Sequence, residues 1–459
     1  MVSDAIQTEA TPTPPPAPPT RRGFNLLAWM VILAVVAIVL VRNGIRTQEN
    51  ANPEKSGNLE NVQLKFQGRY LVGVSEFGLP LEPILEQGRD AFTKTPMHEL
   101  AWAILEAYIL EDDTMGLLLA DQVETKTDDE AWAKELLVGW YDGEQLSEED
   151  RTWLVNKLGW FGELALAHGD AEKSAVINRG AKRMVVALLV VVVLGLIGFM
   201  IGLVLLSFAA VAPSQGWVTF VRPSGQNAGI YAETFALYLV LFVGGSWLLS
   251  FGSWGRWGLV VMGLLMLSTL FVLVWPVLRG VSWATMCDEM GLRFRWADVP
   301  LGVATELAAL PVVLAGALAM LGVMVLARWV LGQELQQPTH PLSDTIEHMT
   351  FSVAVQIFFV AAFCAPVVEE IFFRGALYTN LSQLAHGWRT IARVGFAAFT
   401  SSFLFAVIHP QGWLGALALT PLAMTFALVR ETRGSVWPGV VAHMIHNGTI
   451  CTVVVFILG

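Results

Sequence analysis

Long uncharged apolar runs alternate with short polar segments along most of the chain. The first run covers residues 24–41, and the others follow one another from residue 184 onward. We place the later runs at 184–211, 231–251, 257–278, 301–327, 351–373, 394–409, 412–429 and 435–457. About 20 apolar residues in a helix cross ~30 Å of hydrocarbon, and a backbone in lipid must satisfy its own hydrogen bonds. The pattern therefore predicts an all-α, polytopic membrane helix bundle with about nine spans.

A hydrophilic segment, residues 43–183, separates the first apolar run from the second. Two stretches in it, Thr127 to Glu130 and Ser147 to Asp150, fit the capping box that opens a helix. Apolar residues follow both stretches at helical spacing. We expect an extramembrane helical domain, inserted after the first span, that acts as a solvated spacer or binds a protein partner.

The N-terminal residues 1–23 are rich in proline between positions 11 and 20, which is typical of a disordered tail. Arg21 and Arg22 precede the first apolar run, as basic residues precede the core of a signal peptide. The long proline-rich tail and the lack of a small-x-small cleavage site favour an uncleaved anchor at 24–41.

Composition restricts the class of protein. The chain is 54% hydrophobic and only 15% charged, with a net charge of −11. Segment 43–183 holds 26 Asp and Glu against 14 Lys and Arg, a net charge of −12, so the acidity belongs to this segment. A single soluble core and a nucleic-acid partner are both excluded by these values. Three cysteines are too few for a disulfide scaffold, and Cys364 and Cys451 lie in apolar runs that predict buried thiols.

Arginine placement predicts the orientation in the bilayer. The arginines fall in alternate loops: Arg21 with Arg22, Arg222, Arg279 with Arg293 and Arg295, Arg389 with Arg393, and Arg430 with Arg433. Cytoplasmic loops carry an excess of cations, so these loops are expected on the cytoplasmic side. The acidic domain and the C-terminus would then lie outside, although Arg179, Lys182 and Arg183 flank a span on that side.

Polar side chains interrupt the last apolar runs at three places. They are Glu369, Glu370 and Arg374, then Phe405 and His409, and finally His443 and Asn447. Charged groups deep in a bilayer are expensive and suggest function by default. Taken singly, the three sets also fit a salt bridge at a helix end, an interfacial histidine at a turn, and a hydrogen bond between helices. Their joint occurrence on three helices favours chemistry.

Spacing assigns roles to these groups. Glu370 and Arg374 are four residues apart and can pair on a helix, while Glu369 points about 100° away and is freer to act as a general base. Phe405 can wall the site beside His409.

His443 and Asn447 share a helix face and can offer N–H donors to an oxyanion. Alternatively, Glu369, His409 and His443 could hold a zinc ion, since one Glu and two His form a known ligand set. Glu306, near the start of its run, is interpreted as a membrane-boundary residue, and His446 as a residue that joins helices.

The order Glu-Glu-x-x-x-Arg, Phe-x-x-x-His and His-x-x-x-Asn resembles the CAAX protease and bacteriocin-processing (Abi) family of intramembrane proteases. Here the motifs read Glu369–Arg374, Phe405–His409 and His443–Asn447, within residues 350–457. The resemblance implies hydrolysis of membrane-associated proteins or peptides in a bilayer, expected to be a bacterial plasma membrane. It also implies that Glu369 and His409 activate water, that His443 and Asn447 stabilise the oxyanion, and that Glu370 and Arg374 support them. Residues 184–327 would be accessory helices.

These roles require Glu369 and His409 to lie at a similar depth in the membrane. Glu369 lies near the end of its apolar run and His409 ends the next, so ideal antiparallel helices would put them at opposite membrane faces. The site therefore requires the first helix to continue to about Leu384, or His409 and Pro410 to start a break inside the protein. The competing hypotheses are a transporter that relays protons through the same groups, and a non-catalytic scaffold or immunity protein.

Overall fold

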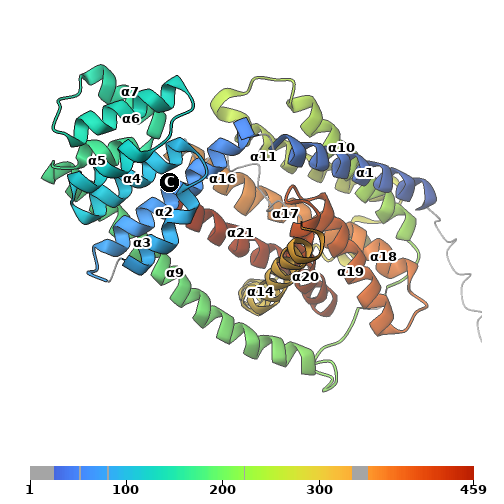
Figure 1. Ribbon diagram of the computed structural model, residues 1–459. Helices are drawn as coiled ribbons and strands as arrows, with labels where there is room; N and C mark the ends of the chain where they lie inside the picture. Colours follow the sequence, from blue (N-terminus) through green and yellow to red (C-terminus); the bar gives the residue numbers. More distant parts are fainter. Residues whose placement is uncertain (1–24, 51–52, 80–81, 222, 333–349, 459) are drawn as a thin grey trace, which may run out of the picture.

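The computed structural model describes residues 25–50, 53–79, 82–221, 223–332 and 350–458, and all regular structure within them is helical. Nine helices in these ranges are long and apolar enough to cross a membrane. Figure 1 shows a cluster of short helices at one end and a bundle of long helices beside it. The predicted all-α membrane bundle is confirmed. The proline-rich tail, Arg21, Arg22 and Arg222 lie outside the described residues.

The membrane-spanning segments agree with the predicted apolar runs except in their ends. They are α1 (Asn25–Asn50); α9 (Ala171–Val211); α10 (Ala228–Leu249); η2 (Gly255–Trp257) with α11 (Gly258–Ser268), η3 (Thr269–Leu273) and α12 (Val274–Leu278); α14 (Asp298–Leu331); α16 (Phe351–Ile357) with η4 (Phe358–Cys364), α17 (Ala365–Glu369), η5 (Glu370–Leu377) and α18 (Tyr378–Leu384); α19 (Thr390–Ile408); α20 (Gly412–Arg433); and α21 (Trp437–Leu458). Two segments are much longer than predicted: α9 begins at Ala171 instead of residue 184, and the sixth segment continues to Leu384 instead of ending near residue 373.

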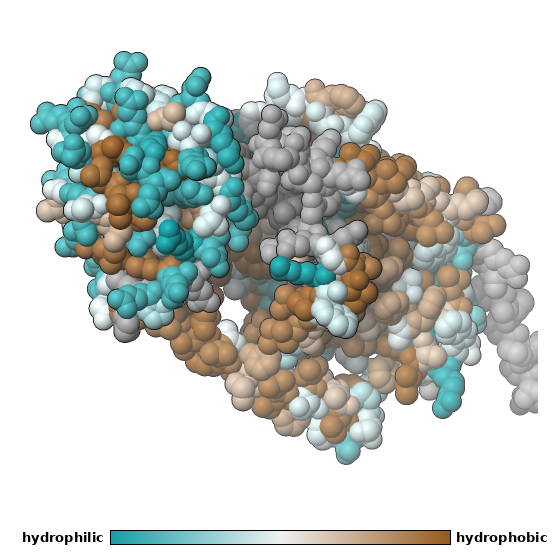
Figure 2. Space-filling view, viewed as in Figure 1, coloured by the Kyte–Doolittle hydropathy of each residue, from teal (hydrophilic) through white to brown (hydrophobic). Residues whose placement is uncertain are grey.

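The acidic segment forms the cluster of short helices. Its elements are α2 (Pro53–Ser75), α3 (Glu82–Arg89), η1 (Asp90–Phe92), α4 (Pro96–Leu110), α5 (Asp113–Gln122), α6 (Asp128–Tyr141), α7 (Glu148–Leu158) and α8 (Trp160–Ala167). Thr127 and Glu130 form the reciprocal capping box predicted for α6, and the Ser147 hydroxyl accepts the N–H of Asp150 at the start of α7. Figure 2 shows hydrophilic residues over this cluster and hydrophobic residues over the long helices.

Helix α9 joins the acidic domain to the membrane bundle without a break. It begins at Ala171, where the Asp170 carboxylate caps the first turn, and it continues to Val211. Inside the acidic domain α9 packs on α2 so closely that a Cβ at Gly73 would lie 2.5 Å from the Ala181 carbonyl oxygen. The boundary predicted at residue 183 therefore falls inside one continuous helix.

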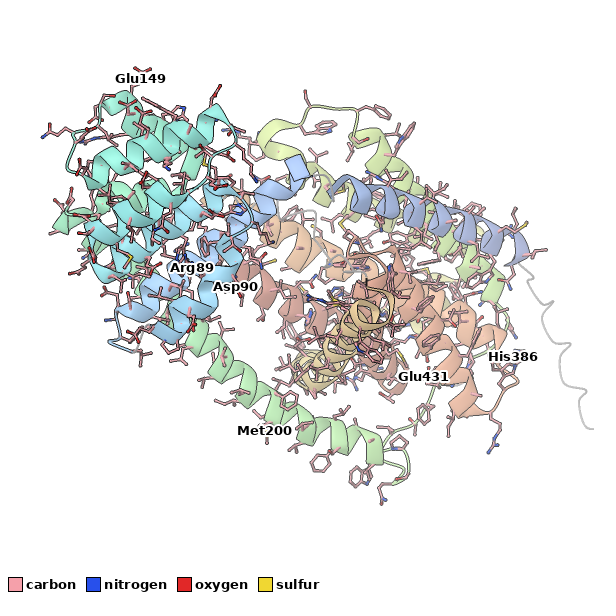
Figure 3. All side chains as sticks on the ribbon, viewed as in Figure 1. Arg89, Asp90, Glu149, Met200, His386 and Glu431 are labelled. Atoms are coloured by element: carbon pink, nitrogen blue, oxygen red, sulfur yellow. The ribbon has the colours of Figure 1, made fainter. Side chains whose placement is uncertain are left out.

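A close helix crossing holds α9 against α14. A Cβ at Gly202 would lie 2.0 Å from the carbonyl oxygen of Leu307, and Gly198 also faces Leu307. Small residues let helix backbones approach in membranes, where apolar side chains gain little by leaving lipid. The opposite face of α9 is exposed, as Met200 illustrates in Figure 3.

Three of the arginine-bearing segments that the structure describes lie together at one end of the bundle. The Arg393 guanidinium lies 2.7 Å from Glu431 Oε1, and the Tyr378 hydroxyl donates to Glu431 Oε2 at 2.9 Å. The Arg430 side chain donates to the carbonyl of Glu289 at 2.6 Å, from another loop. In Figure 3 His386 lies at the end of the molecule opposite Glu149, on the acidic domain. The structure thus collects alternate loops on one side, as the arginine pattern predicts.

We predict that Gly202→Ala lowers the stability of the protein in detergent micelles by about 1–3 kcal/mol, because the new methyl group overpacks the crossing with Leu307. Thermal unfolding of the purified protein measures this change. Gly195→Ala is the matched control on the same helix, because a Cβ there meets nothing within 4 Å. Equal unfolding temperatures for the two variants would contradict the prediction.

Candidate active site

Three membrane segments bring the predicted site residues together. The segment from Phe351 to Leu384 carries two π-helical stretches, η4 and η5, on either side of α17. Glu369 ends α17, and η5 carries Glu370 and Arg374. π-Helical turns are rare and occur frequently at functional sites, so the backbone is irregular where the carboxylates lie.

The depth of Glu369 follows from the length of its helix. The segment Phe351–Leu384 has 34 residues and Glu369 lies close to its midpoint, whereas the antiparallel α19 has 19 residues and stops at Ile408. A turn at residues 409–411 then leads into α20. The condition that the first helix continues to Leu384 is therefore met, and residues 409–411 are the turn between two separate spans.

Glu370 and Arg374 form a fully buried ion pair. Arg374 Nη1 lies 3.0 Å from Glu370 Oε1, and both side chains are 0% exposed. The guanidinium also donates to the carbonyl of Ala423 and lies over the Phe405 ring, 4.6 Å from its centroid. The predicted pairing is confirmed. Removing one partner of a buried pair typically costs about 3–5 kcal/mol, because the other charge is left uncompensated.

The buried pair orients His443. Its Nδ1 lies 3.1 Å from Glu370 Oε1, and a carboxylate accepts hydrogen bonds, so Nδ1 carries the proton. The Nε2 atom of His443 then faces Glu369 Oε2 at 3.8 Å. The Glu369 side chain is 15% exposed, and no hydrogen bond joins it to another side chain in the described part of the protein. Glu369 is thus the freer carboxylate, as its spacing predicts.

His409 has a defined tautomer. Its Nδ1 lies 2.7 Å from the carbonyl oxygen of Phe405, which can only accept, so the proton of the neutral ring is on Nδ1. The Phe405 ring centroid lies 4.1 Å from that of His409 and 5.9 Å from that of His443. Phe405 therefore walls the site between the two imidazoles. The side-chain amide of Asn43, on α1, donates to the carbonyl of His409 at 3.2 Å.

Asn447 lies one turn beyond His443 on α21 and contacts η4. Its Nδ2 donates to the carbonyl of Ala361 at 2.8 Å. This bond uses one of the two N–H groups of the amide. The role of Asn447 as an oxyanion donor stays a prediction that this geometry does not test.

The zinc alternative requires donors that converge on one point. Among the residues that the structure describes, no three His, Cys, Asp or Glu side chains are grouped to hold a metal ion. The Nδ1 of His443 is engaged by Glu370, and its Nε2 faces Glu369. A zinc-bound histidine also donates its other ring N–H to a carboxylate, so the zinc alternative for Glu369, His409 and His443 stays a prediction.

Two further residues, which no sequence motif singles out, shape the site. Gly439 lies one turn before His443, and a Cβ there would meet Glu370 Oε2 at 2.9 Å. The Phe426 ring lies 5.6 Å from the His443 ring and covers its other side. Glycine and phenylalanine are common in membrane helices, so neither residue gives a signal without its neighbours.

We predict that Gly439→Ala destabilises the protein by about 1–3 kcal/mol and lowers its activity, because Glu370 is held by Arg374 and His443 and cannot move aside. Thermal unfolding and cleavage assays on the purified protein measure both effects. Gly448→Ala is the control on the same helix, where a Cβ makes an ordinary 3.8 Å contact. A Gly439→Ala protein with wild-type unfolding temperature and activity would contradict this prediction.

Comparison with known proteins covers the C-terminal part of the chain. Residues 351–449 match the family model described as type II CAAX prenyl endopeptidase Rce1-like. No curated protein and no solved structure matches the chain. The matched range contains His409 and His443, whose rings lie on either side of Phe405, and Glu369, which lies 3.8 Å from His443. Residues 351–449 of this membrane protein thus form a domain of the Rce1-like type II CAAX prenyl endopeptidase family, which agrees with the CAAX-protease resemblance of the three motifs.

Proposed function

We propose that the protein is an intramembrane endopeptidase that hydrolyses peptide bonds with water activated by Glu369. The observation that carries the proposal is the approach of Glu369 Oε2 to His443 Nε2 at 3.8 Å, with His443 fixed by the buried Glu370–Arg374 pair. This separation is too long for a direct hydrogen bond and suits one bridging water.

Glu369 is the general base in this proposal. It takes a proton from the water as the water oxygen bonds to the carbonyl carbon of the substrate, and it later gives that proton to the leaving amine. His409 is proposed to assist from the other side of Phe405, where its ring packs on the Phe405 ring and its Nδ1 donates to the Phe405 carbonyl. Glu369 ends α17, and His409 follows the last residue of α19.

His443 and Asn447 are proposed to stabilise the oxyanion. His443 can donate through Nε2 only when it is protonated there, and the Glu370 carboxylate at Nδ1 balances the resulting positive charge. Asn447 contributes the N–H group that Ala361 does not use. The protein supplies these donors in a site from which most bulk water is excluded.

The substrate class follows from the bilayer and the family. The matching family is described as CAAX prenyl endopeptidases. For this protein we propose membrane-associated proteins or peptides as substrates, with prenylated ones as one member of the class. The family match favours a peptidase over the transporter and the scaffold.

We predict that Glu369→Gln lowers cleavage of a membrane-peptide library by at least about 10³-fold, and His409→Ala by about 10²-fold, because each removes a proton acceptor. The assay uses the purified protein in liposomes and follows new peptide termini by mass spectrometry. The controls are Glu149→Gln, on the exposed surface of the acidic domain, and His386→Ala, at the other end of the molecule (Figure 3). A Glu369→Gln protein as active as the wild type would end the proposal.

We also propose that the acidic domain lies outside the cytoplasm, available to a protein partner, because the arginine loops gather at the opposite end. In intact cells, a membrane-impermeant maleimide should label Glu149→Cys, whereas Ala284→Cys should require permeabilisation. Both positions are exposed, and Ala284 belongs to the short helix whose Glu289 carbonyl binds Arg430. Labelling of Ala284→Cys alone in intact cells would reverse the orientation.

A further inference from the structure

A second carboxylate–imidazole pair lies beside the proposed active site. Glu306 Oε1, on α14, is 2.9 Å from Nδ1 of His446, on α21. Glu306 is only 6% exposed, and its other oxygen, Oε2, has no hydrogen-bond partner among the described residues. The helix-joining interpretation of His446 is confirmed, whereas the interpretation of Glu306 as a membrane-boundary residue stays a prediction. A buried carboxylate with an unpartnered oxygen is costly in a membrane helix, which points to a role in function.

The pair lies on the surface along which α14 packs against α21. A Cβ at Gly302, one turn before Glu306, would lie 2.5 Å from Val441 Cβ. Ala309, the next buried residue along α14, packs with Ala442 in a small cluster. Glu306 thus projects from the face of α14 that is already in close contact with α21, and its length reaches His446.

Helix α21 presents two adjacent faces to two different neighbours. Gly439 and His443 face the Glu370 carboxylate, whereas Val441 and His446 face α14. His443 and His446 are three residues apart, so they belong to the same turn and move as one unit. The rotation of α21 about its axis therefore sets where His443 Nε2 points.

We infer that Glu306 is a positioning residue of the peptidase site, acting on His443 through His446 and the backbone of α21. This inference rests on the proposed function of Glu369 and His443. The hydrogen bond to Glu370 fixes the His443 ring on one face of α21. The hydrogen bond between Glu306 and His446 fixes α21 itself on the adjacent face. Two anchors on adjacent faces prevent the rotation that either anchor alone would permit.

Glu306 also connects an accessory helix, α14, to the proposed active site. Glu306 lies outside residues 351–449, the range matched by the family model. Its neighbour Leu307 is the residue whose carbonyl contacts Gly202 of α9. Helix α14 is thus held between α9 and α21 at the level of Glu306, and α9 begins in the acidic domain.

The test separates a positioning role from simple joining of two helices. Glu306→Leu removes the acceptor for His446 Nδ1 at nearly constant volume, and Glu306→Gln retains an acceptor oxygen. His446→Leu breaks the same bond from the other side. The control is Thr305→Val, because the Thr305 hydroxyl is buried beside Glu306 but donates only to the Leu301 carbonyl of its own helix. Cleavage kinetics and thermal unfolding are measured for each variant in liposomes or detergent.

We expect Glu306→Leu to lower kcat by about 10-fold or more with KM within about twofold, because a displaced catalytic group slows the reaction step without weakening substrate binding. Glu306→Gln should recover most of kcat, His446→Leu should match Glu306→Leu, and the double variant should be no worse than either. Thr305→Val should behave as the wild type. A wild-type kcat in Glu306→Leu, or a loss confined to KM, would overturn the inference.

Two further outcomes are decisive. If neither Leu variant folds, the pair is a structural one and the positioning role is overturned. If the wild type shows no cleavage that depends on Glu369, the proposed function itself fails. If the wild type is active and Glu306→Leu is equally active, only the positioning role of Glu306 fails.

Discussion

The site depends on the contacts that the Glu370 carboxylate makes with its neighbours. This carboxylate is fully buried, and it binds Arg374 within its own helix and His443 on another. Charges of opposite sign attract strongly where water is excluded, so each partner keeps the others in place. Because His443 Nδ1 must donate to Glu370, its Nε2 can only face Glu369. One buried ion pair thereby sets the tautomer and direction of an imidazole on an adjacent helix.

Glycines make this geometry accessible in a bilayer. Gly439 lets the Glu370 carboxylate pass close to α21, and Gly302 and Gly202 let α14 approach α21 on one side and α9 on the other. Packing, not expulsion from water, holds membrane helices together, so backbone proximity determines which side chains can meet. The accessory helices are for this reason in direct contact with the helix that carries His443.

Much of the site could be predicted from the sequence because it depends on local spacing. Glu370 and Arg374, and Phe405 and His409, are each four residues apart, and both contacts are present. Contacts between residues on distant segments could not be predicted from spacing along one helix. Asn43 reaches the carbonyl of His409 across 366 positions of the chain, and Glu306 reaches His446 across 140. No periodicity in either segment relates such residues to each other.

Hydrophobic length and residue spacing along single helices were enough to predict the class of the protein: about nine apolar helices, an acidic helical insertion, and three polar motifs whose order indicates a CAAX-type peptidase. The depth of Glu369 depends instead on contacts between helices. Its helix continues to Leu384 through polar residues, Asn380 and Gln383 among them, that are buried against other helices. The tertiary structure also decided which nitrogen of His443 faces Glu369, because that choice depends on a partner 73 residues away.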